Sequence, residues 1–135
     1  MTQEDKELLL KDICARLPYG VKVKFGDNPN IFDLEYRIKF AVIYGDSDKL
    51  EDILDITNIK PYLFPLSSIT IEQERELSKL GVSYGEYALH DDIRGLGIMV
   101  DEAYIFFEFC YKHHIDFLGL IEKGLAIDAR GLNIY

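Results

Sequence analysis

The clearest structural signal in the chain lies in residues 21–44, which read VKVKFGDNPNIFDLEYRIKFAVIY. Apolar and polar residues alternate over 21–25, and the alternation resumes over 32–44 after the dense turn signal GDNPN. Strict alternation is typical of a strand with one buried face, because successive side chains point to opposite sides of a sheet. The second run exceeds a typical strand of about five or six residues, so we expect either a bulge or break near residues 36–38 or one long bent strand. These patterns predict a small antiparallel sheet of three to four strands.

A first helix is predicted over roughly residues 3–16, before the sheet. Thr2 followed by Asp5 is typical of a helix start, where a hydroxyl caps free backbone amides and an acid lies in the first turn. Apolar residues then recur at helical spacing, and Leu-Pro-Tyr-Gly at 17–20 ends the element. Such a helix buries one apolar stripe.

The C-terminal half is predicted to be mainly helical. Residues 60–68 contain two prolines and are expected to form an irregular apolar connector. Thr70 and Gln73 then form a capping box, which opens a surface-lying helix. A further helix is indicated over residues 98–114, and residues 117–123 are expected to add one or two helical turns before short extended pieces.

Length and composition indicate one globular domain of the α+β class spanning residues 1–135. Hydrophobic residues make up 48% of the chain and charged residues 29%, which is ordinary for a folded domain. We expect a cytoplasmic protein, because the N-terminus lacks a secretory pattern and the most apolar run, 98–111, is interrupted by acids. With that location, Cys14 and Cys110 are interpreted as buried thiols.

The charge of the chain is unevenly distributed. Residues 1–44 carry seven basic and seven acidic side chains, whereas residues 45–135 carry eight basic and seventeen acidic ones, which gives the net charge of −9. Nucleic-acid binding needs clustered Lys and Arg, so this balance argues against it. An acidic surface instead speeds the capture of basic partners.

The helix over residues 98–114 carries more apolar and aromatic residues than one buried face can hold. Either this helix is covered on two sides, or part of it contacts a partner; self-association into a homo-oligomer is a further alternative. We therefore expect a protein partner with a basic surface. The candidate partner-binding residues are Asp46, Asp48, Asp52, Asp55, Tyr104 and Tyr111.

The alternative hypothesis is a metal-dependent hydrolase that uses a His/Asp cluster. Imidazole and carboxylate are ligands that hydrolytic metals prefer. The spacing is not diagnostic, because adjacent histidines on a helix diverge by about 100°, and a helix C-terminus favours positive charge in any case. We assign no catalytic, metal or cofactor residue, and no cofactor. The residues of this alternative are His90, Asp91, Asp92, His113, His114 and Asp116.

Three stretches carry a resemblance to a known group of proteins. They read LLLKDICARLPYGVKVK at 8–24, IKPYLFPLSSITIEQ at 59–73 and HIDFLGLIEKGLAIDA at 114–129. Together they resemble small, uncharacterised proteins of gut Bacteroidetes and their phages or mobile elements. The resemblance implies a source and no activity. The leading expectation is a non-enzymatic intracellular accessory protein, borne by a phage or mobile element, which binds a basic protein and contacts neither nucleic acid nor membrane.

Overall fold

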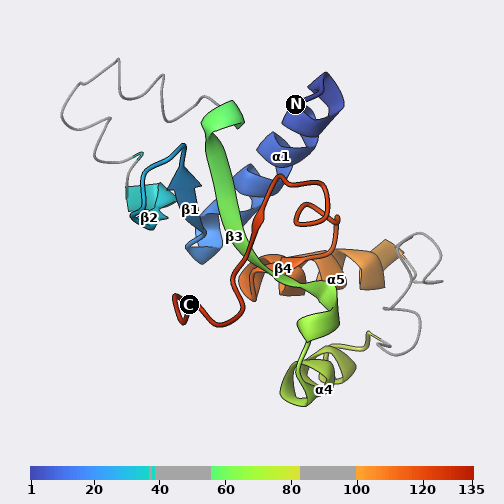
Figure 1. Cartoon of the computed structure of the whole chain (residues 1–135). Coiled ribbons are helices and arrows are strands. Elements are labelled where there is room, and N and C mark those ends of the chain that lie inside the picture. Colours follow the sequence, from blue (N-terminus) through green and yellow to red (C-terminus); the bar gives the residue numbers. More distant parts are fainter. Residues whose placement is uncertain (37, 39–55, 83–99) are drawn as a thin grey trace.

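The structure, a computed structural model, describes residues 1–36, 38, 56–82 and 100–135. Its helices pack around a small sheet, with the long strand at the centre (Figure 1). The predicted α+β class is therefore confirmed. The α-helices are α1 (Gln3–Arg16), α4 (Ile71–Lys79) and α5 (Val100–Lys112), and the 3-10 turns are η1 (Leu17–Tyr19), η2 (Ile56–Asn58) and η3 (Leu66–Ser68).

The sheet is mixed, which corrects the expectation of a purely antiparallel one. Its central strand pairs antiparallel with β1 and parallel with β4 and β5, while β1 pairs antiparallel with β2. The parallel pairs arise because the chain leaves the central strand through α4 and α5 before it returns, and a crossover of this kind favours parallel pairing. The strands are β1 (Lys22–Phe25), β2 (Phe32–Asp33), β3 (Ile59–Pro65), β4 (Ile115–Asp116) and β5 (Ile127–Asp128).

The segment expected to be an irregular connector over residues 60–68 is instead mostly the central strand β3. Prolines normally argue against a central strand, because they donate no backbone hydrogen bond. Here the residues between the two prolines make the long-range bonds. The Phe64 N–H donates to the carbonyl of His114, and the Leu63 carbonyl accepts from the Ala129 N–H. Leu63 is fully buried, so the strand is anchored by packing as well.

Of the two alternatives for the second alternating run, the structure shows the break and not one long bent strand, and the break begins slightly earlier than residues 36–38. Strand β2 ends at Asp33, and residues 34–36 are helical. The Asp33 carboxylate accepts the N–H of Tyr36 at 3.0 Å, a local bond that favours the turn over a longer strand. The rest of that run, residues 39–44, lies outside the described part of the chain.

Both predicted helix starts are confirmed: the capping box predicted at Thr70 and Gln73 forms, and the predicted N-cap at Thr2 is part of a second one with Asp5. Thr2 accepts from the N–H of Asp5 at the start of α1, and Thr70 accepts from the N–H of Gln73 at the start of α4. In each helix the third residue returns the bond to the backbone of the cap, which satisfies two free donors at once.

The two cysteines differ in exposure. Cys110 is buried as expected, but Cys14 is exposed, which corrects the prediction that both thiols are buried. Residues Leu9 and Ile13 define the buried face of α1, and Cys14 lies one residue beyond that face.

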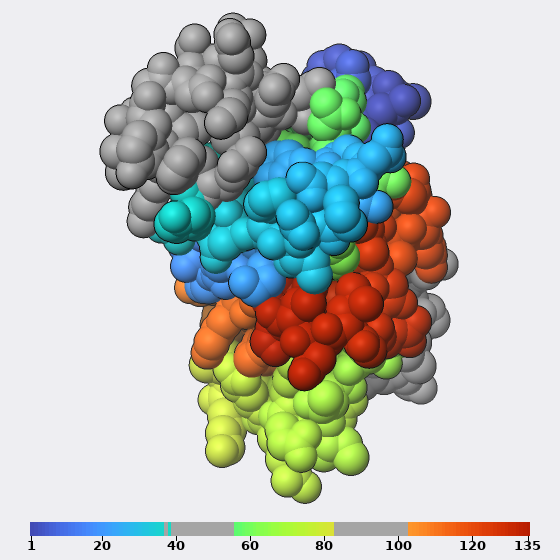
Figure 2. Space-filling view, turned by 60° about the vertical axis from the view of Figure 1, so that its left-hand side comes forward, coloured from blue at the N-terminus to red at the C-terminus, as the bar shows by residue number. Residues whose placement is uncertain are grey.

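The core has two parts. The first lies between α1 and the sheet, and the second lies between α4, α5 and the segment that follows α5. The C-terminal residues lie between the N-terminal strands and the α4 region (Figure 2, red between blue-cyan and yellow-green).

The helical turns expected over residues 117–123 are hydrogen-bonded turns rather than a helix, and the chain then forms β5. Among the described residues, no helix has both the length and the apolar composition of a membrane span.

A buried ion pair connects the two halves of the chain. Arg16 is fully buried, and its guanidinium donates to both Asp12 carboxylate oxygens, at 2.8 Å from Nε and 3.0 Å from Nη2. It also donates to the carbonyls of Cys110, at 3.3 Å, and Ile115, at 2.8 Å. Desolvation raises the pKa of the Asp12 carboxyl, and the hydrogen bonds from Arg16 oppose that rise. Thus α1 is bound to the end of α5 and to β4.

We expect Asp12→Ala to lower the free energy of unfolding by about 3–5 kcal/mol, because it leaves a buried guanidinium without its carboxylate. Urea denaturation followed by circular dichroism measures the loss. The control is the double variant Asp12→Leu with Arg16→Met, which removes both charges and should cost less than the single change. A double variant less stable than Asp12→Ala would contradict this account.

Candidate binding pocket

Helix α5 carries two stripes of side chains, which explains its excess of aromatic residues. The first stripe contains Phe106, Phe109 and Cys110, all buried in the second part of the core. The second stripe, referred to below as the outer stripe, follows the spacing i, i+3, i+4 and i+7, which places its members on one side of the helix. It consists of Tyr104, Phe107, Glu108 and Tyr111.

The outer stripe forms one wall of an open pocket of about 340 Å³. The other wall consists of Ala15 from α1 with Pro18 and Tyr19 from η1. The Tyr19 hydroxyl donates to Glu108 Oε1 at 3.2 Å, which joins the two walls across the pocket. Proline at the start of η1 directs the chain out of α1, so that Tyr19 faces α5.

The back of the pocket is fixed by ring contacts. Phe107 stacks on Phe117 with centroids 4.9 Å apart, and Tyr111 meets Phe117 edge-on at 5.3 Å. The buried Arg16 guanidinium lies 5.2 Å from the Tyr111 ring centroid, as in a cation–π contact. At the rim, Tyr104 is 70% exposed and free to meet a ligand.

The charge of the pocket lining comes from Glu108 alone, since the other lining residues are apolar or tyrosine. The pKa of Tyr19 is raised by desolvation and by its hydrogen bond to Glu108. Burial, with a smaller contribution from the charge of Asp12, raises the pKa of Tyr111. Both tyrosines therefore keep their hydroxyl protons at neutral pH, and the lining carries one negative charge among aromatic rings.

Two of the predicted partner-binding residues, Tyr104 and Tyr111, come together in this pocket. The other four, Asp46, Asp48, Asp52 and Asp55, lie outside the described residues. Sequence reasoning missed the other five residues of the lining, among them Glu108 and Tyr19, whose side chains are polar. Glu108 was detectable, because it lies four residues after Tyr104 on the same side of a helix, whereas Tyr19 lay in a segment read only as a helix end.

Among the described residues of the hydrolase alternative, His113 and Asp116 have separate partners. His113 Nε2 lies 3.0 Å from Glu76 Oε2, which links α5 to α4. The Asp116 carboxylate accepts the backbone N–H groups of Leu120 and Ile121, at 2.9 and 2.8 Å.

Within the described ranges, no three potential metal ligands gather in one place. The remaining residues of that alternative, His90, Asp91 and Asp92, fall in the part of the chain that is not described.

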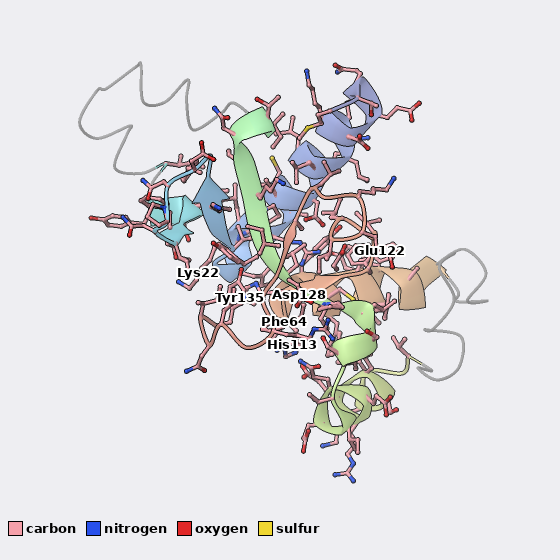
Figure 3. All side chains as sticks on the ribbon, viewed as in Figure 1. Lys22, Phe64, His113, Glu122, Asp128 and Tyr135 are labelled. Atoms are coloured by element: carbon pink, nitrogen blue, oxygen red, sulfur yellow. The ribbon has the colours of Figure 1, made fainter. Side chains whose placement is uncertain are left out.

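Tyr135 occupies a separate polar site between β1 and β3 (Figure 3). Val23 pairs with Pro61 in this ladder, so the next rung would join Lys22 to Tyr62. The Tyr135 hydroxyl takes that place: it accepts the Lys22 N–H at 2.9 Å and donates to the Tyr62 carbonyl at 2.7 Å. Burial raises the pKa of this hydroxyl to about 12. A side chain thus completes the pairing where the two strands separate.

The ring of His114 packs against the ring of Tyr135. The two rings are stacked, with centroids 3.6 Å apart and planes 12° from parallel. The His114 backbone is left-handed, with φ of 59°, and its buried Nδ1 atom has no hydrogen-bond partner. Desolvation, with smaller contributions from the charges of Arg16, His113 and Lys22, lowers the pKa of His114 to about 4. The ring is therefore neutral at physiological pH.

Comparison with known proteins gives no match. No family model matches the chain, and neither a curated protein nor a solved structure matches it. What the pocket can bind thus follows only from its residues and their chemistry.

We expect Tyr135→Phe to destabilise the protein by about 1–3 kcal/mol, because two backbone groups lose the hydroxyl that pairs them. Thermal and urea denaturation measure the change. The matched control is Tyr104→Phe, which removes a hydroxyl from an exposed ring and should shift stability by no more than about 0.5 kcal/mol. An unchanged midpoint for Tyr135→Phe would show that Lys22 and Tyr62 pair directly once the hydroxyl is gone.

Stability should also depend on the protonation of His114. Its folded pKa is depressed, so the unfolded state binds the extra proton first, and stability falls as the pH drops from about 6.5 towards about 4. Between pH 7 and pH 5 the free energy of unfolding of the wild type should fall by about 1 kcal/mol more than that of His114→Asn. This figure allows for solvent screening of a partly exposed ring. Asparagine tolerates the left-handed backbone. Urea titrations at the two pH values measure these changes. If the free energy of unfolding falls equally in the wild type and in His114→Asn, the prediction is refuted.

Proposed function

We propose that the protein is a small interaction protein that binds a basic protein partner, and that the pocket between η1 and α5 is its binding site. The observation that carries the proposal is an aromatic pocket with a single carboxylate on its wall. Tyr104 stands at the rim, and Glu108 lies four residues further along the same side of the helix. We further propose that it acts in the cytoplasm, where the free thiols of Cys14 and Cys110 stay reduced.

The charge of the chain supports a basic partner. The net charge of −9 attracts a positively charged surface over a distance and raises the rate of encounter. Aromatic rings beside a carboxylate then suit a cationic side chain at close range, since the ring faces are electron-rich. Long-range and short-range terms thus favour the same kind of partner.

The form of the pocket supports a protein partner. Tyrosine is enriched among residues that dominate protein interfaces, because it contributes a large contact area and a polar tip. The rear rings are held by Phe117 and Arg16. Little side-chain freedom remains to be lost there when a ligand binds, which lowers the entropic cost of association.

Panning a random-peptide display library against the protein tests this proposal without assuming a host. We expect enriched peptides to be rich in Lys and Arg. Their affinity should fall up to about fivefold with Glu108→Gln and up to about fivefold with Tyr104→Ala, the sizes typical of one exposed charge pair and one exposed cation–π contact. The matched control is Glu72→Gln, which makes the same charge change at an exposed site on α4.

Three outcomes would contradict the proposal. Enrichment of acidic or purely apolar peptides would exclude a basic partner. Equal loss of binding with Glu72→Gln would show that overall charge, rather than the pocket, attracts the peptides. Light scattering that shows concentration-dependent dimers, abolished by Tyr104→Ala, would identify a second copy of this chain as the occupant.

A further inference from the structure

We infer that the ligand of the pocket is an arginine side chain of the partner, in preference to lysine. The inference rests on the proposed function and names the chemical group that the site selects. It follows from three features of the pocket: its ring surfaces, its oriented carboxylate and its size.

The ring surfaces favour a planar cation. A guanidinium is flat and weakly hydrated, so it stacks on aromatic rings, whereas an ammonium is compact and strongly hydrated. The protein already holds one guanidinium in this way. Arg16 lies 5.2 Å from the Tyr111 centroid and 5.9 Å from that of Phe117, in the wall directly behind the pocket. The pocket offers further rings, those of Tyr19 and Tyr104, to a second guanidinium.

The carboxylate is oriented for a forked donor. The Tyr19 hydroxyl donates to Glu108 Oε1 at 3.2 Å, which restrains the carboxylate across the pocket. Each carboxylate oxygen has two lone pairs, so this bond leaves acceptor sites on both oxygens. A guanidinium can then donate two parallel hydrogen bonds, which an ammonium cannot do with the same geometry. Tyr19 thus acts as a positioning residue for Glu108.

The size of the pocket suits one long side chain. Its volume of about 340 Å³ is at the lower end of the range for ligand sites, about 300–1,000 Å³. A single anchor fits such a space better than a folded segment does. The rest of the partner would then contact the surface around the rim, where Tyr104 is exposed.

The test is isothermal titration of the full chain with three matched peptides, acetyl-Gly-Ser-Xaa-Ser-Gly-amide, where Xaa is arginine, lysine or citrulline. Citrulline keeps the planar shape and lacks the charge. We expect the arginine peptide to bind at least tenfold more tightly than the lysine peptide, and citrulline to bind most weakly. NMR spectra locate the binding site through changes in the chemical shifts of the ring protons of Tyr104 and Tyr111.

Two variants separate orientation of the carboxylate from simple loss of charge. Tyr19→Phe keeps the ring and removes the hydroxyl that restrains Glu108. It should reduce the ratio of the affinities for the arginine and lysine peptides at least threefold, while the affinity for the lysine peptide stays within twofold of its wild-type value. Glu72→Gln removes a charge from an exposed site on α4, outside the pocket lining, and should leave the ratio unchanged. A ratio that is unaffected by Tyr19→Phe would overturn the positioning role.

The outcomes distinguish this inference from the proposed function. Equal binding of arginine and lysine overturns the inference and leaves a basic partner in place. Citrulline binding as tightly as arginine overturns both, because charge would then play no part. If display enriches basic peptides but none of the three peptides shifts Tyr104 or Tyr111, the pocket is not the binding site. The inference then fails together with the proposed site, and only the basic partner remains.

Discussion

The structure depends on the burial of a single guanidinium. Arg16 is fully buried, and a charge in that position is tolerated only when hydrogen bonds and an opposite charge compensate for lost water. Asp12 supplies the opposite charge from the same helix, and the carbonyls of Cys110 and Ile115 supply the remaining acceptors. These requirements fix the position of α1 relative to the end of α5 and to β4. Because Tyr111 packs over the same guanidinium, the interaction that orders the fold also orders the back of the pocket.

The local parts of this fold could be predicted from the sequence. The capping residues Thr2 and Thr70 identify two helix starts, and the alternating residues of β1 identify a strand. These signals are short-range, so they can be read without knowledge of the partner segments. The central strand β3 was not predicted, because two prolines in a short segment are typical of an irregular connector. The hydrogen bonds that make it a strand join it to residues about 50 and 65 positions later in the chain. The parallel pairing was missed for the same reason.

The pocket was predictable in part. The excess of aromatic residues on α5 indicated a second contact surface, and Tyr104 and Tyr111 were identified as members of it. Tyr19 was not, because only the fold brings η1 against that helix, through its bond to Glu108, which is 89 residues away. A stripe with i, i+3, i+4 and i+7 spacing defines one wall of such a site from sequence, whereas the opposite wall depends on tertiary packing.

The long-range bonds of Arg16 have a kinetic consequence. Its two carbonyl acceptors lie 94 and 99 residues further along the chain. Helix α1 can form early from its own capping box, but its buried polar side chains have no complete set of partners until α5 and β4 arrive. Contacts across such separations slow folding, because the chain entropy of closing the loop is lost before the contacts are gained. We therefore expect the guanidinium of Arg16 to gain its full set of acceptors only after α5 and β4 have formed beside α1.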